Sequence, residues 1–186
     1  PDAADGRARA DLLARLQALA DAVCTNYPGA RLQAFGSSVS GLGSNGADLD
    51  LSLVLPGDAD IPDAAQRAMV SELAEKLEAS GQYSSVFARP KARVPIVALH
   101  DAATGLKSDI CMCNRLALLN SRLLRCYMEL DPRAPALCFA VKHWAKRRGI
   151  KEPYRGSPSS YAWAHMAIHF LQTRQPPVLP CLQALS

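Results

Sequence analysis

The sequence has no apolar run close to the roughly 20 residues that a membrane-spanning helix requires. Residues 1–9 also lack the charged segment and following apolar stretch that mark a secretory signal. Internal repeats and low-complexity segments are absent too. We therefore expect no membrane partner and no repeat architecture. With 49% hydrophobic and 20% charged residues, the composition is that of an ordinary globular protein.

Metal-binding cysteine patterns are also missing. None of the 6 cysteines forms a C-x-x-C pair, and none combines with histidine at a spacing typical of zinc. Cys111 and Cys113 would share one face of a strand, which suits core packing better than metal ligation. Reduced thiols predict an intracellular protein, with the cytoplasm and the mitochondrion as open alternatives.

A strong excess of one charge sign is absent as well. The chain has 21 lysines and arginines and 17 aspartates and glutamates, and a net charge of +4 alone is weak evidence for a polyanionic partner. The distribution of charge is more informative, because basic residues concentrate in one segment. This segment, residues 142–151, contains Lys142, Lys146, Arg147, Arg148 and Lys151.

The front of the chain alternates between helical and strand patterns. Hydrophobic periodicity predicts helices over residues 10–26 and 64–80, and period-two alternation predicts a strand over residues 48–55. Further strands are expected at residues 31–35, 83–88, 94–99 and 107–113. The pattern therefore predicts a mixed sheet flanked by helices.

After residue 114 only helical periodicity remains, over residues 116–128, 135–147 and 159–172. The predicted fold class is therefore α+β. A mixed-sheet domain, residues 1–114, precedes an all-helical domain, residues 115–186. The first helix of the chain, although part of the front domain, could pack on the helical domain instead. Because three amphipathic helices without a fourth partner look like half a domain, we expect the helical domain to be incomplete.

Two carboxylates one residue apart stand out in the strand predicted at residues 48–55. Period-two geometry puts Asp48 and Asp50 on one face, while Leu49 and Leu51 point to the other. Like charges this close repel unless a cation lies between them, and carboxylate oxygens are ligands of Mg²⁺. A turn acid followed by a solvated edge-strand acid is the alternative, but the neighbouring motifs favour a metal site.

A pair of metal ions would need a third carboxylate, and Asp109 is the best candidate. It lies beside Ile110 in an apolar predicted strand, where an unpaired charge is costly. The alternative is a strand-end acid near Lys107.

A Gly-Ser turn precedes the acids. Ser37 and Ser38 follow Gly36 at a predicted strand-to-helix turn, where backbone N–H groups and hydroxyls can bind phosphate oxygens. For this short motif alone, a plain helix N-cap at Ser37 is the alternative.

Rear-domain residues add features of a nucleotide site. Lys142 and Lys146 share one helix face, where an anion such as a triphosphate would relieve their repulsion; a solvated basic face is the alternative. Tyr161 follows Ser160 at a helix start and suits either base stacking or the core. Asn120 lies in an apolar helical stretch and bonds either a ligand or neighbouring backbone.

Together these residues resemble the non-canonical RNA nucleotidyltransferases, namely the terminal uridylyltransferases and poly(A) polymerases of the DNA polymerase β superfamily. The resemblance is carried by Phe35-Gly36-Ser37, the acids 48, 50 and 109, and residues 120–124, 141–146 and 159–161. Residues 169–183 are similar to the uridylyltransferase branch. The match covers residues 32–183 and implies that the front domain is a polymerase β-like nucleotidyltransferase domain.

The resemblance also implies roles for individual residues. The catalytic acids, which would bind Mg²⁺ or in its place Mn²⁺, are Asp48, Asp50 and Asp109. The nucleotide-binding residues would be Gly36, Ser37, Ser38, Asn120, Ser121, Lys142, Lys146, Ser160 and Tyr161. Within this set, Ser37 and the two lysines would hold phosphates, Asn120 the ribose and Tyr161 the base. RNA would be bound by Arg147, Arg148 and Lys151.

The activity implied by the resemblance is template-independent addition of UMP from UTP to RNA 3′ ends. A poly(A) polymerase that uses ATP is the first alternative, and an inactive scaffold of the same fold is the second. The partners would be an RNA 3′ end and UTP or ATP. In this family a further loop of the helical domain helps to choose the base, so the preference for UTP depends on the branch resemblance alone.

Overall fold

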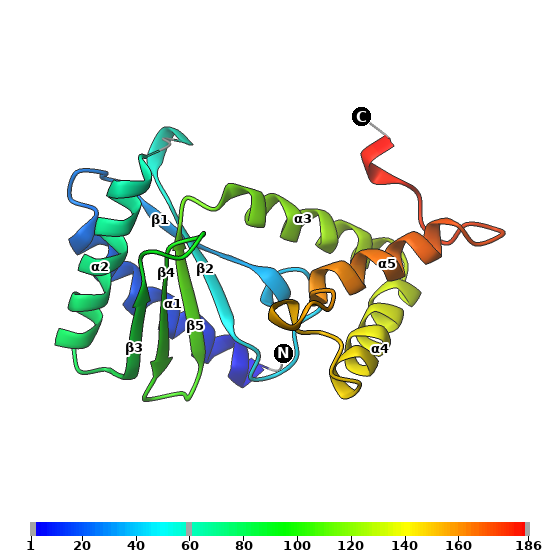
Figure 1. Ribbon diagram of the computed structural model, residues 1–186, viewed down its shortest axis with the longest axis horizontal. Helices are drawn as coiled ribbons and strands as arrows, with labels where there is room; N and C mark the ends of the chain where they lie inside the picture. Colours follow the sequence, from blue (N-terminus) through cyan, green and yellow to red (C-terminus); the bar gives the residue numbers. More distant parts are fainter. Residues whose placement is uncertain (1–2, 59–60, 185–186) are drawn as a thin grey trace. The chain divides into compact units, whose positions relative to one another are not determined.

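The computed structural model describes residues 3–58 and 61–184, which form two compact units (Figure 1). The sheet unit comprises the chain up to residue 39 together with residues 43–121. The helical unit comprises residues 40–42 together with the chain from residue 122 onward. The chain therefore leaves the sheet unit for three residues, returns to it, and leaves it again within a helix.

The sheet unit is built on five strands in the order β1-β2-β5-β4-β3. These are β1 (Arg31–Phe35), β2 (Leu49–Val54), β3 (Tyr83–Arg89), β4 (Ile96–Asp101) and β5 (Lys107–Met112). β2 and β5 run parallel, whereas the other neighbours are antiparallel. The predicted mixed sheet is thus confirmed. The largest shift is at β4, which begins two residues after the predicted start because Pro95 cannot donate a ladder hydrogen bond.

Two helices cover one face of this sheet, α1 (Ala3–Val23) and α2 (Asp63–Ala79). In α1 the residues Leu12, Leu16 and Ala20 recur at four-residue spacing and are completely buried. α1 starts seven residues before its predicted start, since an ion pair between Arg9 and Asp5 at i,i+4 spacing supports the polar first turns.

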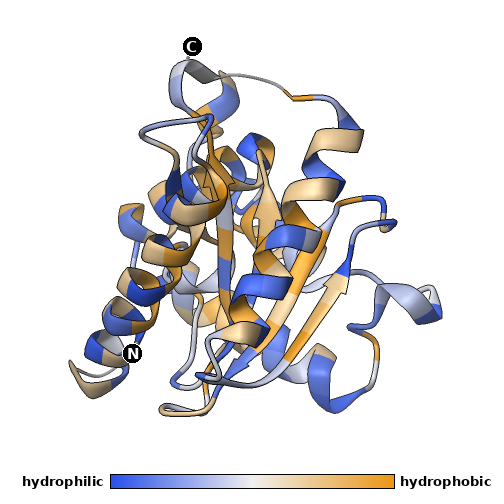
Figure 2. Cartoon of the chain, turned by 90° about the vertical axis from the view of Figure 1, so that its left-hand side faces the viewer, coloured by the Kyte–Doolittle hydropathy of each residue, from blue (hydrophilic) through white to orange (hydrophobic). Residues whose placement is uncertain are grey.

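The core of the sheet unit lies between these helices and the sheet. Alternate strand residues point into it, including Leu51 and Leu53 of β2, Val97 of β4 and Ile110 of β5. Figure 2 shows the central strands coloured largely as hydrophobic, beside helices that carry residues of both kinds. The residues in between, which point to the other face, include two of the predicted catalytic acids, Asp50 and Asp109.

The helical unit contains most of α3 (Arg115–Leu130), with α4 (Arg133–Arg147) and α5 (Ser160–Gln172). Its core gathers Tyr127, Cys138 and Ile168 with Leu42, which comes from the short excursion of the chain. All three predicted rear helices are present. In the part of the chain that the structure describes, no helix is both long and apolar enough to cross a bilayer.

Short 3₁₀ turns complete the chain, at Gly36–Ser38, Pro56–Asp58, Pro153–Arg155 and Leu182–Ala184. The last of these is fixed by the buried Tyr127, whose hydroxyl bonds to Gln183 Oε1 and accepts from the backbone N–H of Leu182.

Candidate active site

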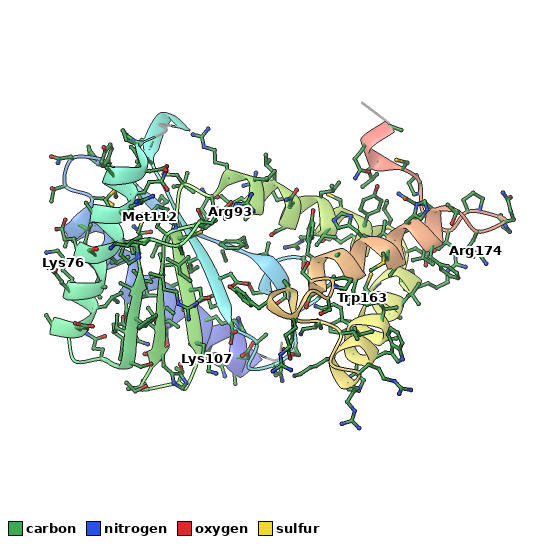
Figure 3. All side chains as sticks on the ribbon, viewed as in Figure 1. Lys76, Arg93, Lys107, Met112, Trp163 and Arg174 are labelled. Carbon is green, nitrogen blue, oxygen red and sulfur yellow. The ribbon has the colours of Figure 1, made fainter. Side chains whose placement is uncertain are left out.

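The parallel pairing of β2 with β5 brings two predicted catalytic acids together. Asp50 is the direct neighbour of Asp109 in the register of the two strands. Adjacent strands lie about 4.8 Å apart, and neighbours in register project from the same face. Both acids therefore stand on the sheet face opposite α1 and α2. Lys107 and Met112, labelled in Figure 3, mark the two ends of the strand that carries Asp109.

The third predicted acid, Asp48, lies two residues before Asp50 and immediately before β2 begins. It is exposed, whereas Asp50 is half-buried. Burial raises the pKa of Asp50 to about 6, with further contributions from the negative charges of Asp109 and Asp48. Burial and the charge of Asp48 also raise the pKa of Asp109. The acids thus repel one another and favour a compensating positive charge.

A divalent cation fits this donor set, because carboxylate oxygens are its preferred ligands and its charge would relieve the repulsion. Within residues 3–58 and 61–184, however, no three acidic, histidine or cysteine side chains gather closely enough to form a complete metal site. The observed core of the site is the pair Asp50 and Asp109. The full ligand set with Asp48 stays a prediction.

The Gly36 turn lies directly against Asp50. Phe35 is paired with Asp50 in the sheet register, and Gly36 has a φ of 72°. A Cβ at Gly36 would collide with the Asp50 carboxylate, so only glycine allows the chain to pass this close. The requirement for glycine here is therefore both conformational and steric.

Ser121 supports this turn from α3. Its hydroxyl accepts a hydrogen bond from the backbone N–H of Gly36 at 2.8 Å and donates to the carbonyl of Ala117 at 2.7 Å. The side chain is buried. Ser121 was predicted to contact nucleotide, and its observed contacts are those of a residue that fixes the turn.

The two serines of the turn lie in a single 3₁₀ turn. The chain passes from β1 directly into this helical turn, as predicted, but the turn is 3₁₀ and no α-helix follows it. The Ser38 hydroxyl donates to the carbonyl of Phe35 at 3.0 Å, whereas Ser37 is half-buried in the middle of the turn. Gly43 packs closely against the turn: a Cβ at this position would lie 2.8 Å from the carbonyl oxygen of Ser37, so only glycine fits here without a shift of the backbone.

Arg9 and Asp5 were not predicted from the sequence as part of the site. Arg9 Nε donates to Asp5 at 2.7 Å, and its Nη2 donates to the carbonyl of Ala47, the residue before Asp48, at 2.6 Å. Its positive charge also opposes the rise in the pKa of Asp50. The i,i+4 spacing of the pair predicts a helical ion pair, but nothing local indicates the contact with Ala47.

Asn120 is half-buried on α3, within the sheet unit. The start of α3 is fixed to β2, because the backbone N–H of Asn114 donates to Ser52 Oγ at 2.9 Å. The side chain of Asn114 in turn accepts from the N–H of Ala117 at 3.2 Å and caps the helix.

The predicted lysines lie in the helical unit. Lys142 is half-buried, and its Nζ donates to the carbonyl of Leu42 at 2.9 Å. Burial lowers the pKa of Lys142, and the positive charge of Lys151 lowers it further. Lys146, one turn later on α4, is exposed. The two amines thus share a helix but differ in their surroundings.

The remaining predicted residues also belong to the helical unit. Tyr161 is 42% exposed, and its ring packs edge-on against His165 with the centroids 4.3 Å apart. Ser160 begins α5 and is half-buried, and the preceding serine caps the helix. Of the predicted RNA-binding residues, Arg147 and Arg148 are exposed and Lys151 is half-buried.

A hollow of about 240 Å³ at the carboxyl end of β5 contains none of the predicted acids. Arg93 and Met112, labelled in Figure 3, are among the residues that line it, together with Asn114. The candidate active site is therefore not this hollow but the sheet face that carries Asp50 and Asp109.

The sequence that forms the sheet unit matches a known family. Residues 1–129 match the family model described as the central palm domain of mitochondrial-like poly(A) RNA polymerase. The chain belongs to the non-canonical RNA nucleotidyltransferases. This result confirms both the family resemblance and the predicted fold class.

Curated relatives of this chain include terminal uridylyltransferase 7 of Homo sapiens, which is 38% identical over 160 residues, 86% of this chain and 11% of the relative. Poly(A) RNA polymerase GLD2-B of Xenopus laevis is 36% identical over 157 residues, 84% of this chain and 31% of the relative. The chain thus spans less than a third of these relatives.

Solved structures of similar proteins agree with the fold. The GLD-2–GLD-3 poly(A) polymerase complex gives a TM-score of 0.88 at 30% identity, covering all of this chain and 58% of that chain. The Cid1 poly(U) polymerase bound to MgGTP gives a TM-score of 0.82 at 31% identity, covering 96% and 54%.

Proposed function

We propose that the protein adds UMP from UTP to RNA 3′ ends without a template, by two-metal catalysis. The observation that carries the proposal is the pairing of Asp50 with Asp109 beside the Gly36 turn. It sets two mutually repelling carboxylates beside a backbone turn that packs directly against one of them. Charge-neutralising metal ions and a phosphate group are the ligands that suit this combination.

Asp48, Asp50 and Asp109 would hold Mg²⁺, or Mn²⁺ in its place. When bound, the ions lower the pKa of the attacking 3′-hydroxyl and neutralise the leaving pyrophosphate. Asp50 and Asp109 orient this chemistry, because their strands fix them in register. The raised pKa values of both acids support the assignment, since each is costly to ionise without a cation.

The residues that we propose to bind the nucleotide occur in each of the two units. Ser37, Lys142 and Lys146 hold the triphosphate, with a smaller contribution from Ser38. Lys142 is suited to this role because its hydrogen bond to a carbonyl limits the positions of its amine. Asn120 contacts the ribose, and the exposed ring of Tyr161 stacks on the base beside Ser160.

The choice of UTP is the finer part of the proposal. It is supported by the similarity of residues 169–183 to the uridylyltransferase branch. Use of ATP is the first alternative, favoured by the poly(A) polymerases among the relatives. An inactive scaffold is the second alternative, and the acid pair speaks against it because it costs stability without a metal.

The test is a primer extension assay. The full-length protein is incubated with labelled RNA and Mg²⁺ and with each of the four nucleoside triphosphates separately, and Asp48→Ala serves as the inactive control. Extension with UTP alone supports the proposal, and extension with ATP alone supports the poly(A) alternative. No extension with any nucleotide would refute the enzymatic proposal and leave the scaffold.

A further inference from the structure

An aromatic ring and a guanidinium extend the row of the catalytic acids across the sheet. In register, Asp109 of β5 neighbours Ala98 of β4, and Ala98 neighbours Phe87 of β3. Since neighbours in register share a face, Phe87 stands on the same face as Asp109, two strands away, or about 10 Å. The small side chain of Ala98 is all that lies between them in this row.

Phe87 does not contribute to the core. Val86 and Ala88, its neighbours in β3, pack against the core of the sheet unit, whereas Phe87 is 59% exposed. The exposed Arg89 lies over its ring, with the guanidinium carbon 5.2 Å from the centroid. The charge of Arg89 also acts on Asp109 and opposes the rise of its pKa.

The order of residues along this row indicates on which side of the acids each substrate binds. The Gly36 turn adjoins Asp50 at the β1 side, so the triphosphate and its leaving pyrophosphate belong on that side. In an in-line displacement, the attacking oxygen approaches from the side opposite the leaving group. The 3′-hydroxyl of the RNA must therefore arrive from the β4 and β3 side.

We propose that Phe87 and Arg89 form the platform on which the 3′ segment of a single-stranded RNA lies as its terminal hydroxyl reaches Asp109. A base stacks on the Phe87 ring, and the Arg89 guanidinium binds a backbone phosphate. Exposed aromatic rings beside basic side chains bind single strands in this way without reading their sequence. The platform rests on the proposed function, because it defines the path of the acceptor RNA to the proposed site.

The chain offers a matched control for this pair. Phe170 of α5 is 47% exposed and carries Arg174 over its ring at 4.3 Å, so it forms the same kind of pair in the helical unit (Figure 3 labels Arg174). Phe170→Ala therefore removes a ring of comparable exposure from a different surface. Phe87→Trp keeps an aromatic face at the platform and tests for rescue.

The experiment measures binding of a labelled oligouridylate to the full chain by fluorescence anisotropy, in EDTA so that no transfer occurs. Phe87→Ala is expected to weaken binding roughly 5- to 150-fold, the loss that corresponds to one stacked base. Phe87→Trp should restore binding, and Phe170→Ala should leave it unchanged. Arg89→Met should lower the slope of log affinity against log salt by about one.

Primer extension with the same variants provides the second readout. Phe87→Ala should raise the KM for RNA and leave the KM for the nucleotide unchanged, which a general loss of folding would not do. If Phe87→Ala binds RNA as tightly as the unmodified chain, or if Phe170→Ala weakens binding equally, the platform is refuted while the proposed activity stands. If the unmodified full-length protein extends no RNA, the proposed activity fails, and anisotropy still decides whether Phe87 binds RNA.

Discussion

Replacing Asp50 by asparagine is expected to stabilise the metal-free protein while abolishing nucleotide transfer. The pKa of Asp50 rises from 3.8 to about 6 on folding, chiefly through burial and then through the charges of Asp109 and Asp48. A carboxyl whose pKa rises on folding binds its proton more tightly in the folded state. The stability of the protein therefore falls as the pH rises through the window from 3.8 to about 6.

The size of this effect follows from the same shift. A rise from 3.8 to about 6 corresponds to at most about 3 kcal/mol of lost folding free energy above the window. Asparagine keeps the shape of the side chain but carries no charge. We therefore expect Asp50→Asn to be up to about 3 kcal/mol more stable at about pH 8, and the difference to vanish at about pH 3.

Urea unfolding in EDTA, followed through the amide resonances of β2 and β5, reports on the sheet unit alone. Asp5→Asn is the control within the same unit, since Arg9 holds the pKa of Asp5 below its usual value and removing this carboxylate should not raise stability. Added Mg²⁺ should stabilise the unmodified protein more than Asp50→Asn. An Asp50→Asn variant that is no more stable at about pH 8, or whose advantage does not depend on pH, would refute this reasoning.

Three further substitutions test other parts of the structure. Gly36→Ala should lower the free energy of unfolding by about 1–3 kcal/mol because of the positive φ at this position, and thermal melting would detect the loss. It should also abolish nucleotide transfer, measured by primer extension, because the new Cβ displaces Asp50. Near-normal activity would contradict the close approach of Gly36 to Asp50. Arg15→Met should cost about 3–5 kcal/mol at neutral pH, because it leaves the fully buried Asp101 carboxylate without its bidentate partner. The pKa of Asp101 is lowered on folding, chiefly by Arg15, so the stability that this ion pair contributes is present above pH 3.8 and is lost as the pH falls through the folded pKa. Urea titrations should therefore show that the destabilisation caused by Arg15→Met becomes smaller in acid. A destabilisation that is the same at every pH would contradict this. Lys142→Met should raise the KM for the nucleotide but not for RNA, in contrast to Phe87→Ala; equal changes in both would argue against phosphate binding.

The residues that could be predicted from the sequence are those whose geometry is local. Asp50 could be placed on the face opposite Leu51 because a strand has a period of two, and Ser160 could be placed at a helix start because capping signals are short-range. Asp109 was selected because an acid in an apolar strand needs a partner, and the sheet register brings it beside Asp50.

The contacts that could not be predicted connect residues distant in sequence. The hydroxyl of Ser121 bonds the N–H of Gly36 across 85 positions, and Arg9 bonds the Ala47 carbonyl across 38. Neither partner carries a local signal, since a serine in an apolar helix and an arginine in a polar helix are both ordinary. Such pairs are fixed by the crossing of α3 and α1 with the sheet, which depends on the packing of the whole unit.

The three-residue excursion of the chain has a practical consequence for dissecting this protein. Leu42 is 4% exposed in the core of the helical unit, and its carbonyl holds Lys142, yet it lies between the Gly36 turn and Asp48 in sequence. A truncated helical fragment that starts at Arg122 would lack this leucine and leave a gap among its apolar side chains. Expression of the helical unit by itself should therefore yield a loosened product unless residues 40–42 are supplied in trans or grafted on.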